Sequence, residues 1–248
     1  MLALADPQTQ TTVTQTPELS ERAQALAAFP QRLADRPIAI GAGLFEASFN
    51  AGYQFNSTLG FGEVPVMRYG LSSMWEVILL GVRMIIAEDA QYVPGLALRF
   101  QLHDLAYQHD AENPYNYPVL RPGVFLELRD RLPLHITANV SAGYLANIQA
   151  DPNLDTGQQV TAQFFPLNGS VEYSPIDILS FVGAGFWIQD VGRDPYTAIT
   201  QTHYGLSAAA MWIPNNQIDV QAFFRANWYD GRSFGFVPQV GLGATIRL

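Results

Sequence analysis

The side chains able to support catalysis or metal binding are few and scattered. The sequence has no cysteine, which excludes disulfides and thiol catalysis, and none of its serines stands in the glycine-flanked turn that exposes a nucleophile. No two histidines have ligand spacing along one strand, so a hydrogen-bonded histidine is a better interpretation than a metal or proton-linked site. The four histidines are His103, His109, His135 and His203. These patterns predict no enzyme, no metal site and no cofactor.

Arginines and carboxylates form the second group of chemically active side chains. All thirteen basic residues are arginine, and the formal net charge of −9 leaves no electrostatic footprint for nucleic acid. Single charges recur on the polar face of alternating segments, where they would oppose one another inside a closed sheet. There they would form a structural ion-pair network or line a polar path for a small solute. The candidates for this lining are Glu46, Arg68, Glu76, Arg99, Glu127, Arg129, His135, Glu172, Asp219, Arg225 and Arg247.

Extended strands must position these charges. In residues 218–228, apolar side chains such as Val220 and Phe224 alternate without a fault with polar ones such as Asp219 and Arg225. Alternation over about ten residues is typical of transmembrane strands, which turn apolar residues to lipid and polar ones to a lumen. The same pattern is present in residues 45–55, 134–144 and 239–248. The lumen of the predicted barrel is therefore the candidate site.

The composition indicates a chain whose surface lies largely in lipid. It is 48% hydrophobic and 14% charged, below the usual quarter for a soluble domain. A transmembrane helix needs about 20 apolar residues, and the longest apolar run, residues 77–87, is short and contains Arg83. Only helices and closed barrels satisfy their backbone in lipid. The sequence therefore predicts an all-β, antiparallel up-and-down transmembrane β-barrel of the bacterial outer membrane.

A soluble β-sandwich is the main alternative, because its strands also alternate. The polar face of a sandwich meets water, whereas the polar face here is rich in Gly, Ser, Asn and Gln, which suits a narrow lumen. Tryptophan also favours the barrel, because it is enriched at membrane interfaces. The four tryptophans, all near the ends of predicted strands, are Trp75, Trp187, Trp212 and Trp228.

The sequence indicates the number of strands less directly than it indicates that they cross a membrane. Eleven segments alternate, but a single-chain bacterial barrel has an even number of strands. Twelve result if residues 37–43 add a strand, and ten if one early segment does not span; we favour twelve. The alternation breaks within residues 75–86, where Glu76 and Arg83 fall on opposite faces. Short turns are predicted at residues 130–133, 174–177 and 214–217, and longer outer connections at residues 108–118, 149–158 and 189–202.

Residues 1–36 differ in kind from residues 37–248, which we assign to the barrel. A polar tail comes first. Residues 18–33 then predict an amphipathic helix that begins after Thr16 and Pro17 and ends or kinks at Pro30. This segment either lies at the periplasmic mouth or inserts into the lumen as a plug. Residues 3–5, followed by Asp6, fit the small-residue rule for signal-peptide cleavage, so we expect an upstream extension.

Residues 68–76 and 80–83 resemble the hairpin of a broad group of outer-membrane barrels. That group includes transporter-like proteins and the MetA-pathway of phenol degradation family. Residues 94–99 and 241–248 are compatible with it, although Ser73 replaces the usual aspartate and Leu248 the usual terminal aromatic residue. The resemblance implies a monomeric barrel of about twelve strands that passes small, often apolar or aromatic, compounds.

Two functions fit the predicted fold. The first is a channel for the passive passage of small, apolar or aromatic solutes across the outer membrane. The alternative is a non-conducting barrel that anchors or scaffolds a multiprotein outer-membrane assembly. An outer-membrane enzyme is a weaker third, because the sequence clusters no nucleophile with a base. The expected partners are outer-membrane lipid, a small solute, and proteins that contact the N-terminal segment or the loops; nucleic acid is not expected.

Overall fold

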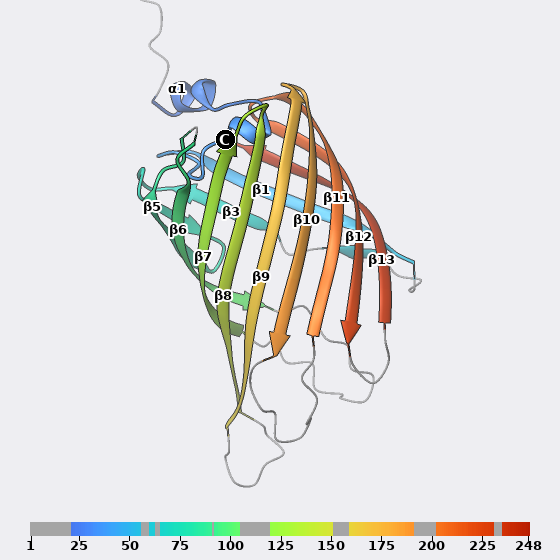
Figure 1. The fold of residues 1–248 in the computed structure, drawn as a ribbon. Helices are drawn as coiled ribbons and strands as arrows, with labels where there is room; N and C mark the ends of the chain where they lie inside the picture. The colour runs from blue at the N-terminus through green and yellow to red at the C-terminus, as the bar shows by residue number, and fades with distance from the viewer. Residues whose placement is uncertain are drawn as a thin grey trace, which may run out of the picture.

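The computed structural model describes residues 21–55, 60–62, 65–90, 92–104, 120–150, 159–190, 202–230 and 235–248. In these residues the chain forms a closed antiparallel β-barrel of twelve wall strands, with a short α-helix at one end (Figure 1). None of the helices described is both long and apolar enough to cross a membrane. The sheet topology confirms the predicted all-β antiparallel barrel and its twelve strands.

The barrel closes between its first and last strands. β1 (Phe45–Gln54) pairs with β13 (Gly235–Arg247), from Glu46 opposite Arg247 to Gln54 opposite Gln239. Two short strands, β2 (Gly60–Gly62) and β3 (Val66–Gly70), both pair with β1, so they count as one interrupted wall strand. The other strands, each paired with its neighbours in sequence, are β4 (Trp75–Ile78), β5 (Gly81–Ala87), β6 (Gly95–Asp104), β7 (Leu120–Leu132), β8 (Ile136–Ala150), β9 (Gln159–Ile176), β10 (Leu179–Asp190), β11 (Thr202–Asn215) and β12 (Ile218–Asp230).

Residues 75–86 form a tight hairpin instead of one strand. β4 and β5 meet at Leu79 and Leu80, where Leu80 has a positive φ of 59°. Glu76 faces Arg83 across the hairpin, so the break in alternation marks a turn. This hairpin supplies the twelfth wall strand. The prediction that residues 37–43 add a strand was wrong, because the N–H groups of Ile38 and Ile40 bond to wall side chains and not to a neighbouring strand.

The two faces of the wall differ as the alternation predicts. In β12, Val220 and Phe224 are 37% and 45% exposed on the outer face, whereas Asp219 is 1% exposed in the lumen. Large exposed apolar side chains recur on the strands from β1 to β13. A soluble monomer does not leave so extensive an apolar surface in water. This outer band is therefore the surface that meets lipid.

Aromatic side chains mark both ends of the apolar band. Tyr204 stacks on Trp228 with 5.5 Å between ring centroids, and Phe236 lies 5.3 Å from Trp228. At the opposite end, where β4 begins and β11 ends, Trp75 and Trp212 are exposed. Tryptophan and tyrosine prefer the boundary between lipid and water. Their positions agree with a band that crosses a membrane.

Three phenylalanines lie over glycines of the neighbouring strand. A Cβ atom added to any of these glycines would come within 2.4 Å of the facing ring. The absence of a side chain therefore lets each ring lie flat against the wall and narrow the lumen. The pairs are Phe125 with Gly143, Phe186 with Gly205, and Phe223 with Gly241.

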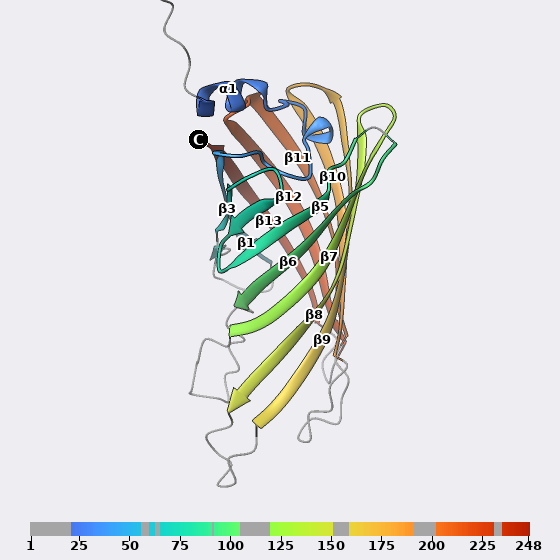
Figure 2. The same ribbon diagram turned by 90° about the vertical axis from the view of Figure 1, so that its left-hand side faces the viewer.

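Short turns lie at one end of the barrel, together with Leu248 (Figure 1). We call this the short-turn end; its turns are residues 71–74, 133–135, 177–178 and 216–217. β7 continues to Leu132, and Leu134 and His135 have positive φ values of 61° and 56°. The predicted turn at residues 130–133 was therefore placed too early, and β8 begins at Ile136. The predicted longer connections fall mainly outside the described residues; at that end the wall reaches farthest at β8 and β9 (Figure 2).

The chain ahead of β1 lies across the short-turn end (Figure 1). α1 (Glu21–Ala28) ends two residues before Pro30, because a proline cannot continue a helix, and a 3-10 turn, η1 (Leu33–Asp35), follows. The earlier part of the predicted helix lies outside the described residues. We call residues 29–44 the mouth segment. Its apolar side chains pack in two clusters, Phe29 with Ile40 and Leu44, and Ile38 and Ala39 with Ile85 and Ala97 of the wall.

Candidate functional site in the barrel lumen

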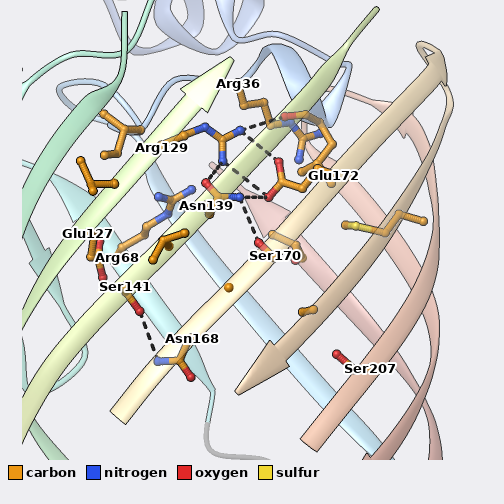
Figure 3. Close-up of a pocket in the computed structure, with 18 of the residues that line it drawn as sticks. Arg36, Arg68, Glu127, Arg129, Asn139, Ser141, Asn168, Ser170, Glu172 and Ser207 are labelled. Carbon is orange, nitrogen blue, oxygen red and sulfur yellow. Dashed lines mark hydrogen bonds and ion pairs between the residues drawn. The ribbon is translucent and has the colours of Figure 1, made fainter. Parts of the chain in front are cut away.

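A polar cavity of about 630 Å³ lies inside the barrel next to the mouth segment (Figure 3). Its lining comes from the mouth segment and from most of the wall strands, including β1, β3, β5 and β7–β13. Arg36 and Arg129 lie on the side toward the mouth segment, whereas Ser141, Asn168 and Ser207 lie farther from it (Figure 3). This cavity is the candidate functional site.

Asp219 joins the mouth segment to the wall. Its carboxylate accepts hydrogen bonds from Arg36 at 2.7 and 2.8 Å and from Arg247 at 2.5 and 3.1 Å. Arg247 continues to Glu46 at 2.6 Å, and Glu46 to Arg68 at 2.8 Å. Arg36, Asp219 and Arg247 are all buried. Because a buried charge without a partner is costly, Arg36 fixes the place of the mouth segment.

A second network is centred on Arg83 of β5. Its Nε donates to Glu127 at 2.7 Å, and its Nη1 donates to Glu76 at 3.1 Å and to the carbonyl of Ile38 at 2.7 Å. Glu127 also pairs with Arg99 at 2.8 Å. The β4–β5 hairpin thus holds the mouth segment through the same arginine that pairs two wall carboxylates.

A third network lies between β7 and β9. Asp89 is buried in the connection after β5 and pairs with Arg131 at 2.5 Å and Arg129 at 3.5 Å. Arg129 reaches Glu172 at 3.1 Å and Asn139 at 2.9 Å (Figure 3). These hydrogen bonds join β7, β8 and β9 on the lumen side of the sheet.

The backbone of the mouth segment bonds to well-separated parts of the wall. The N–H of Ile40 donates to Glu76 of β4 at 2.7 Å, and the N–H of Ala34 donates to Ser174 of β9 at 3.0 Å. The carbonyl of Ala34 accepts from Thr137 of β8 at 2.6 Å. With Arg36 bound to β12, these contacts place the segment across the mouth from wall to wall.

The half of the cavity away from the mouth segment carries hydroxyl and amide groups. Asn168 donates to Ser141 at 3.2 Å, and Ser207 lines the same half (Figure 3). The guanidinium of Arg225 lies 5.5 Å from the centroid of its neighbouring Phe223 ring. Short polar side chains leave space and hydrogen-bonding capacity in this half.

The predicted lining residues other than His135 line the cavity or pair with a residue that does. His135 instead lies on the turn at residues 133–135, and its side chain is 47% exposed. There it contacts Arg32 and Asp35. Its assignment to a lumen-facing strand was wrong, because the positive φ values at this turn take it out of the alternation.

Four charged residues of the networks were not predicted as lining residues. Arg83 fell on the wrong face because the alternation was carried through a turn, for which Gly81 was the main signal. Arg131 continues the alternation of Glu127 and Arg129, so the sequence contained a signal for it. Arg36 and Asp89 lie outside the strands, where no periodic pattern marks them.

The networks determine what chemistry the lumen can support. Within the described ranges, no group of three or more His, Asp or Glu side chains is arranged to hold a metal ion. The side chains of His103 and His203, and the whole of His109, fall outside the described part. The carboxylates that line the cavity form ion pairs with arginine. A bound molecule would therefore meet hydrogen-bonding groups and paired charges in the cavity.

Comparison with solved structures shows that the fold is that of outer-membrane proteins. The porin NanC matches with a TM-score of 0.58 and 12% sequence identity, covering 82% of this chain and 100% of that chain. In-vitro folded OmpT, an outer membrane protein of Vibrio cholerae, matches with a TM-score of 0.47 and 5% identity, covering 83% of this chain and 96% of that chain. The chain matches no protein-family model and no curated protein. The resemblance to the MetA-pathway of phenol degradation family is not confirmed by these matches.

The fold and the outer surface together determine where the protein resides. A closed antiparallel barrel satisfies the backbone hydrogen bonds of every wall strand, because it has no edge strand. Such a barrel presents an apolar outer band with aromatic ends to lipid. Short turns are typical of the periplasmic end of outer-membrane barrels. The protein is a porin-like β-barrel of the bacterial outer membrane.

Proposed function

We propose that the protein is an outer-membrane channel for small solutes, with a periplasmic mouth that the mouth segment holds shut. The observation that carries this proposal is the polar cavity of about 630 Å³ within a closed porin-like barrel. A barrel of twelve strands has a narrow lumen that side chains can largely fill. The space left among the serine, asparagine and glycine residues of the lining supports passage of a solute.

The mouth segment is suited to act as a gate. It precedes β1 and forms no wall strand, so its departure would leave the hydrogen bonds of the barrel intact. Gly41 and Gly43 have positive φ values of 89° and 79°, a conformation that glycine adopts at little cost. Gly43 and Leu44 also bond to Gly70 of β3, which anchors the end next to β1. Residues 29–40 would therefore move about this glycine pair.

The family resemblance and the lining of the cavity support different classes of solute. The resemblance to the MetA-pathway of phenol degradation family implies apolar or aromatic compounds, and Phe186, which lines the cavity, supports that proposal. The charged and hydroxyl-bearing lining supports polar solutes instead. We propose passive passage without catalysis.

A reversible covalent lock tests the gate and the channel together. The chain has no cysteine, so Ala34→Cys combined with Ser174→Cys introduces a single pair where the N–H of Ala34 lies 3.0 Å from Ser174 Oγ. Single-channel conductance in a planar bilayer would be recorded for this variant under oxidising and reducing conditions. A truncation that lacks residues 1–40 would be measured beside it. Ser174→Cys alone is the control and should not respond to the reductant.

The expected result is silence in the oxidised double variant, brief openings after reduction, which frees the mouth segment to move, and steady conductance after truncation. Equal conductance in the oxidised and reduced states would show that the mouth segment is not the gate. Silence in the truncated protein, after folding has been verified by circular dichroism and gel mobility, would overturn the channel.

The alternative is a non-conducting barrel that anchors or scaffolds an outer-membrane assembly. One observation favours it: the mouth segment is bonded to β4, β8, β9 and β12, which leaves the periplasmic end closed. Silence of the truncated protein would make this the better account, with α1 at the periplasmic surface as the site of contact.

A further inference from the structure

The negative charge of each cavity carboxylate is already paired with arginine. In each of them, both oxygen atoms already lie within hydrogen-bonding or ion-pair distance of an arginine or an asparagine. A cation that entered the cavity would therefore meet carboxylates whose charge is already compensated by arginine. The four carboxylates are Glu46, Glu127, Glu172 and Asp219.

Arg68 differs from these carboxylates because it keeps unused donors. Its Nε donates to Glu46 at 2.8 Å, and its side chain is 24% exposed. Among the described residues, Nη1 and Nη2 of Arg68 have no hydrogen-bond acceptor, and Arg68 lines the cavity. A guanidinium carries five N–H groups in a planar fork. Most of the donors of Arg68 thus remain available to a molecule in the cavity.

The net charge of the side chains that line the cavity is positive, like that of Arg68. Six arginines and four carboxylates line the cavity, although the whole chain has a formal net charge of −9. The cavity therefore has a cationic excess inside an acidic protein. A net positive charge in a cleft with low-dielectric walls attracts anions, and arginine linings select anions in membrane pores.

We propose that the cavity binds small organic carboxylates, with Arg68 as the principal anion-binding residue. A guanidinium pairs with a carboxylate through two parallel N–H···O bonds, and Ser141, Asn168 and Ser207 offer hydroxyl and amide groups to the rest of the molecule. This inference deepens the proposed channel and rests on it for the route by which the anion reaches the cavity. It favours polar anions over the apolar compounds that the family resemblance implies.

Binding to the full-length protein in detergent micelles tests the inference independently of conductance. The probe is D-gluconate, titrated by saturation-transfer NMR, and its matched neutral analogue is D-glucitol. We expect D-gluconate to bind and D-glucitol not to bind. In Arg68→Gln the affinity for D-gluconate should fall about tenfold or more, because a hydrogen-bonded charge pair is lost. Arg22→Gln removes the same charge from an exposed position on α1 and should leave the affinity unchanged.

Arg68→Lys provides a second variant that keeps the charge opposite Glu46 while it removes the planar fork. It should weaken D-gluconate binding several-fold, and it remains informative if Arg68→Gln does not fold. Equal binding of D-gluconate and D-glucitol, or native affinity in both Arg68 variants, would overturn the anion site. Binding of D-gluconate to a protein that conducts in no form would keep the anion site and overturn the channel. Conductance without D-gluconate binding would keep the channel and overturn the anion site.

Discussion

The two halves of the lumen are built from different side chains. The half against the mouth segment holds buried ion pairs, such as Arg36 with Asp219 and Arg83 with Glu76. The half beyond it carries hydroxyl and amide groups, such as those of Ser141 and Asn168 (Figure 3). A buried charge needs its partner in one geometry, whereas a hydroxyl or an amide accepts several arrangements. The first half therefore specifies one position of the chain, and the second leaves space.

This difference shows what the ion pairs contribute. The attraction within a buried pair is largely offset by the loss of water, but removal of one partner is strongly destabilising. The networks around Asp219, Arg83 and Asp89 therefore act mainly by selecting the observed position of the mouth segment. Variants in the two halves should differ accordingly, both in size and in the property they change.

Removal of Asp219 should give the largest effect. Asp219→Ala leaves Arg36 and Arg247 without their shared carboxylate, at a cost of about 3–5 kcal/mol. We expect urea unfolding in lipid vesicles, followed by tryptophan fluorescence, to show this loss of stability, together with faster proteolysis of the mouth segment. Asp177→Ala is the control, because Asp177 is 64% exposed at the rim, and it should cost about 1 kcal/mol or less. Equal losses in the two variants would contradict the comparison.

Two glycine substitutions should have different effects on the mouth segment, because they act on the backbone in different halves of the lumen. A Cβ atom at Gly70 would lie 1.9 Å from the carbonyl oxygen of Gly41, whereas one at Gly143 would meet the ring of Phe125 at 2.3 Å. At Gly143 the ring can rotate away, and the carbonyl oxygen of Val124 at 2.8 Å would have to shift slightly within the wall. The backbone of Gly41, in contrast, can move only with the mouth segment. We expect Gly70→Ala to cost about 1–3 kcal/mol and to open the mouth in conductance recordings. Gly143→Ala should leave the mouth closed; opening in both variants would contradict this account.

Loss of one hydrogen bond should give a smaller effect on the same closure. Thr137→Val removes the hydroxyl that donates to the carbonyl of Ala34 at 2.6 Å and leaves that buried oxygen unpaired. The cost is about 1–2 kcal/mol, which corresponds to roughly a tenfold higher open population. In an Ala34→Cys background, maleimide should label the cysteine about tenfold faster than without the Thr137 change. An unchanged rate would show that this hydrogen bond does not hold the mouth segment.

The smallest effect on stability is expected in the far half. Asn168→Ala removes a hydrogen bond of 3.2 Å to Ser141 on a partly exposed stretch of the lining. The free energy of unfolding in urea should change by about 0.5 kcal/mol or less, because water can satisfy Ser141. The mouth should stay closed to protease. A loss as large as that of Asp219→Ala would mean that this half is also a structural network.

The alternating strands were the part of the fold that the sequence predicted best. In β12 and β13, Asp219 and Arg247 stand on the lumen face and Val220 and Ile246 on the outer face, as their spacing indicates. A strand in a barrel wall presents successive residues to two different solvents, so local order along the chain carries this information. The lumen placement of most candidate residues follows from the same periodicity.

The turns were predicted less well, because their signals are weak. Residues 79–80 turn on two leucines and residues 133–135 on Pro133, Leu134 and His135, and positive φ values at leucine and histidine are uncommon. The missed turn at residues 79–80 put Arg83 outside, and the misplaced turn at residues 130–133 put His135 inside. Pairing across the sheet holds these turns in place, and pairing is invisible in a short window of sequence.

The sequence by itself determined the barrel, its lipid-facing band and the face on which most of its charges lie, because each depends on a residue and its near neighbours. The tertiary structure alone decided which charges meet. Arg36 and Asp219 are 183 positions apart, and they pair because closure of β1 on β13 brings β12 beside the mouth segment. Which carboxylates are paired and which arginine keeps free donors depends on these distant contacts, since a charge acts on whatever lies within a few ångströms in space.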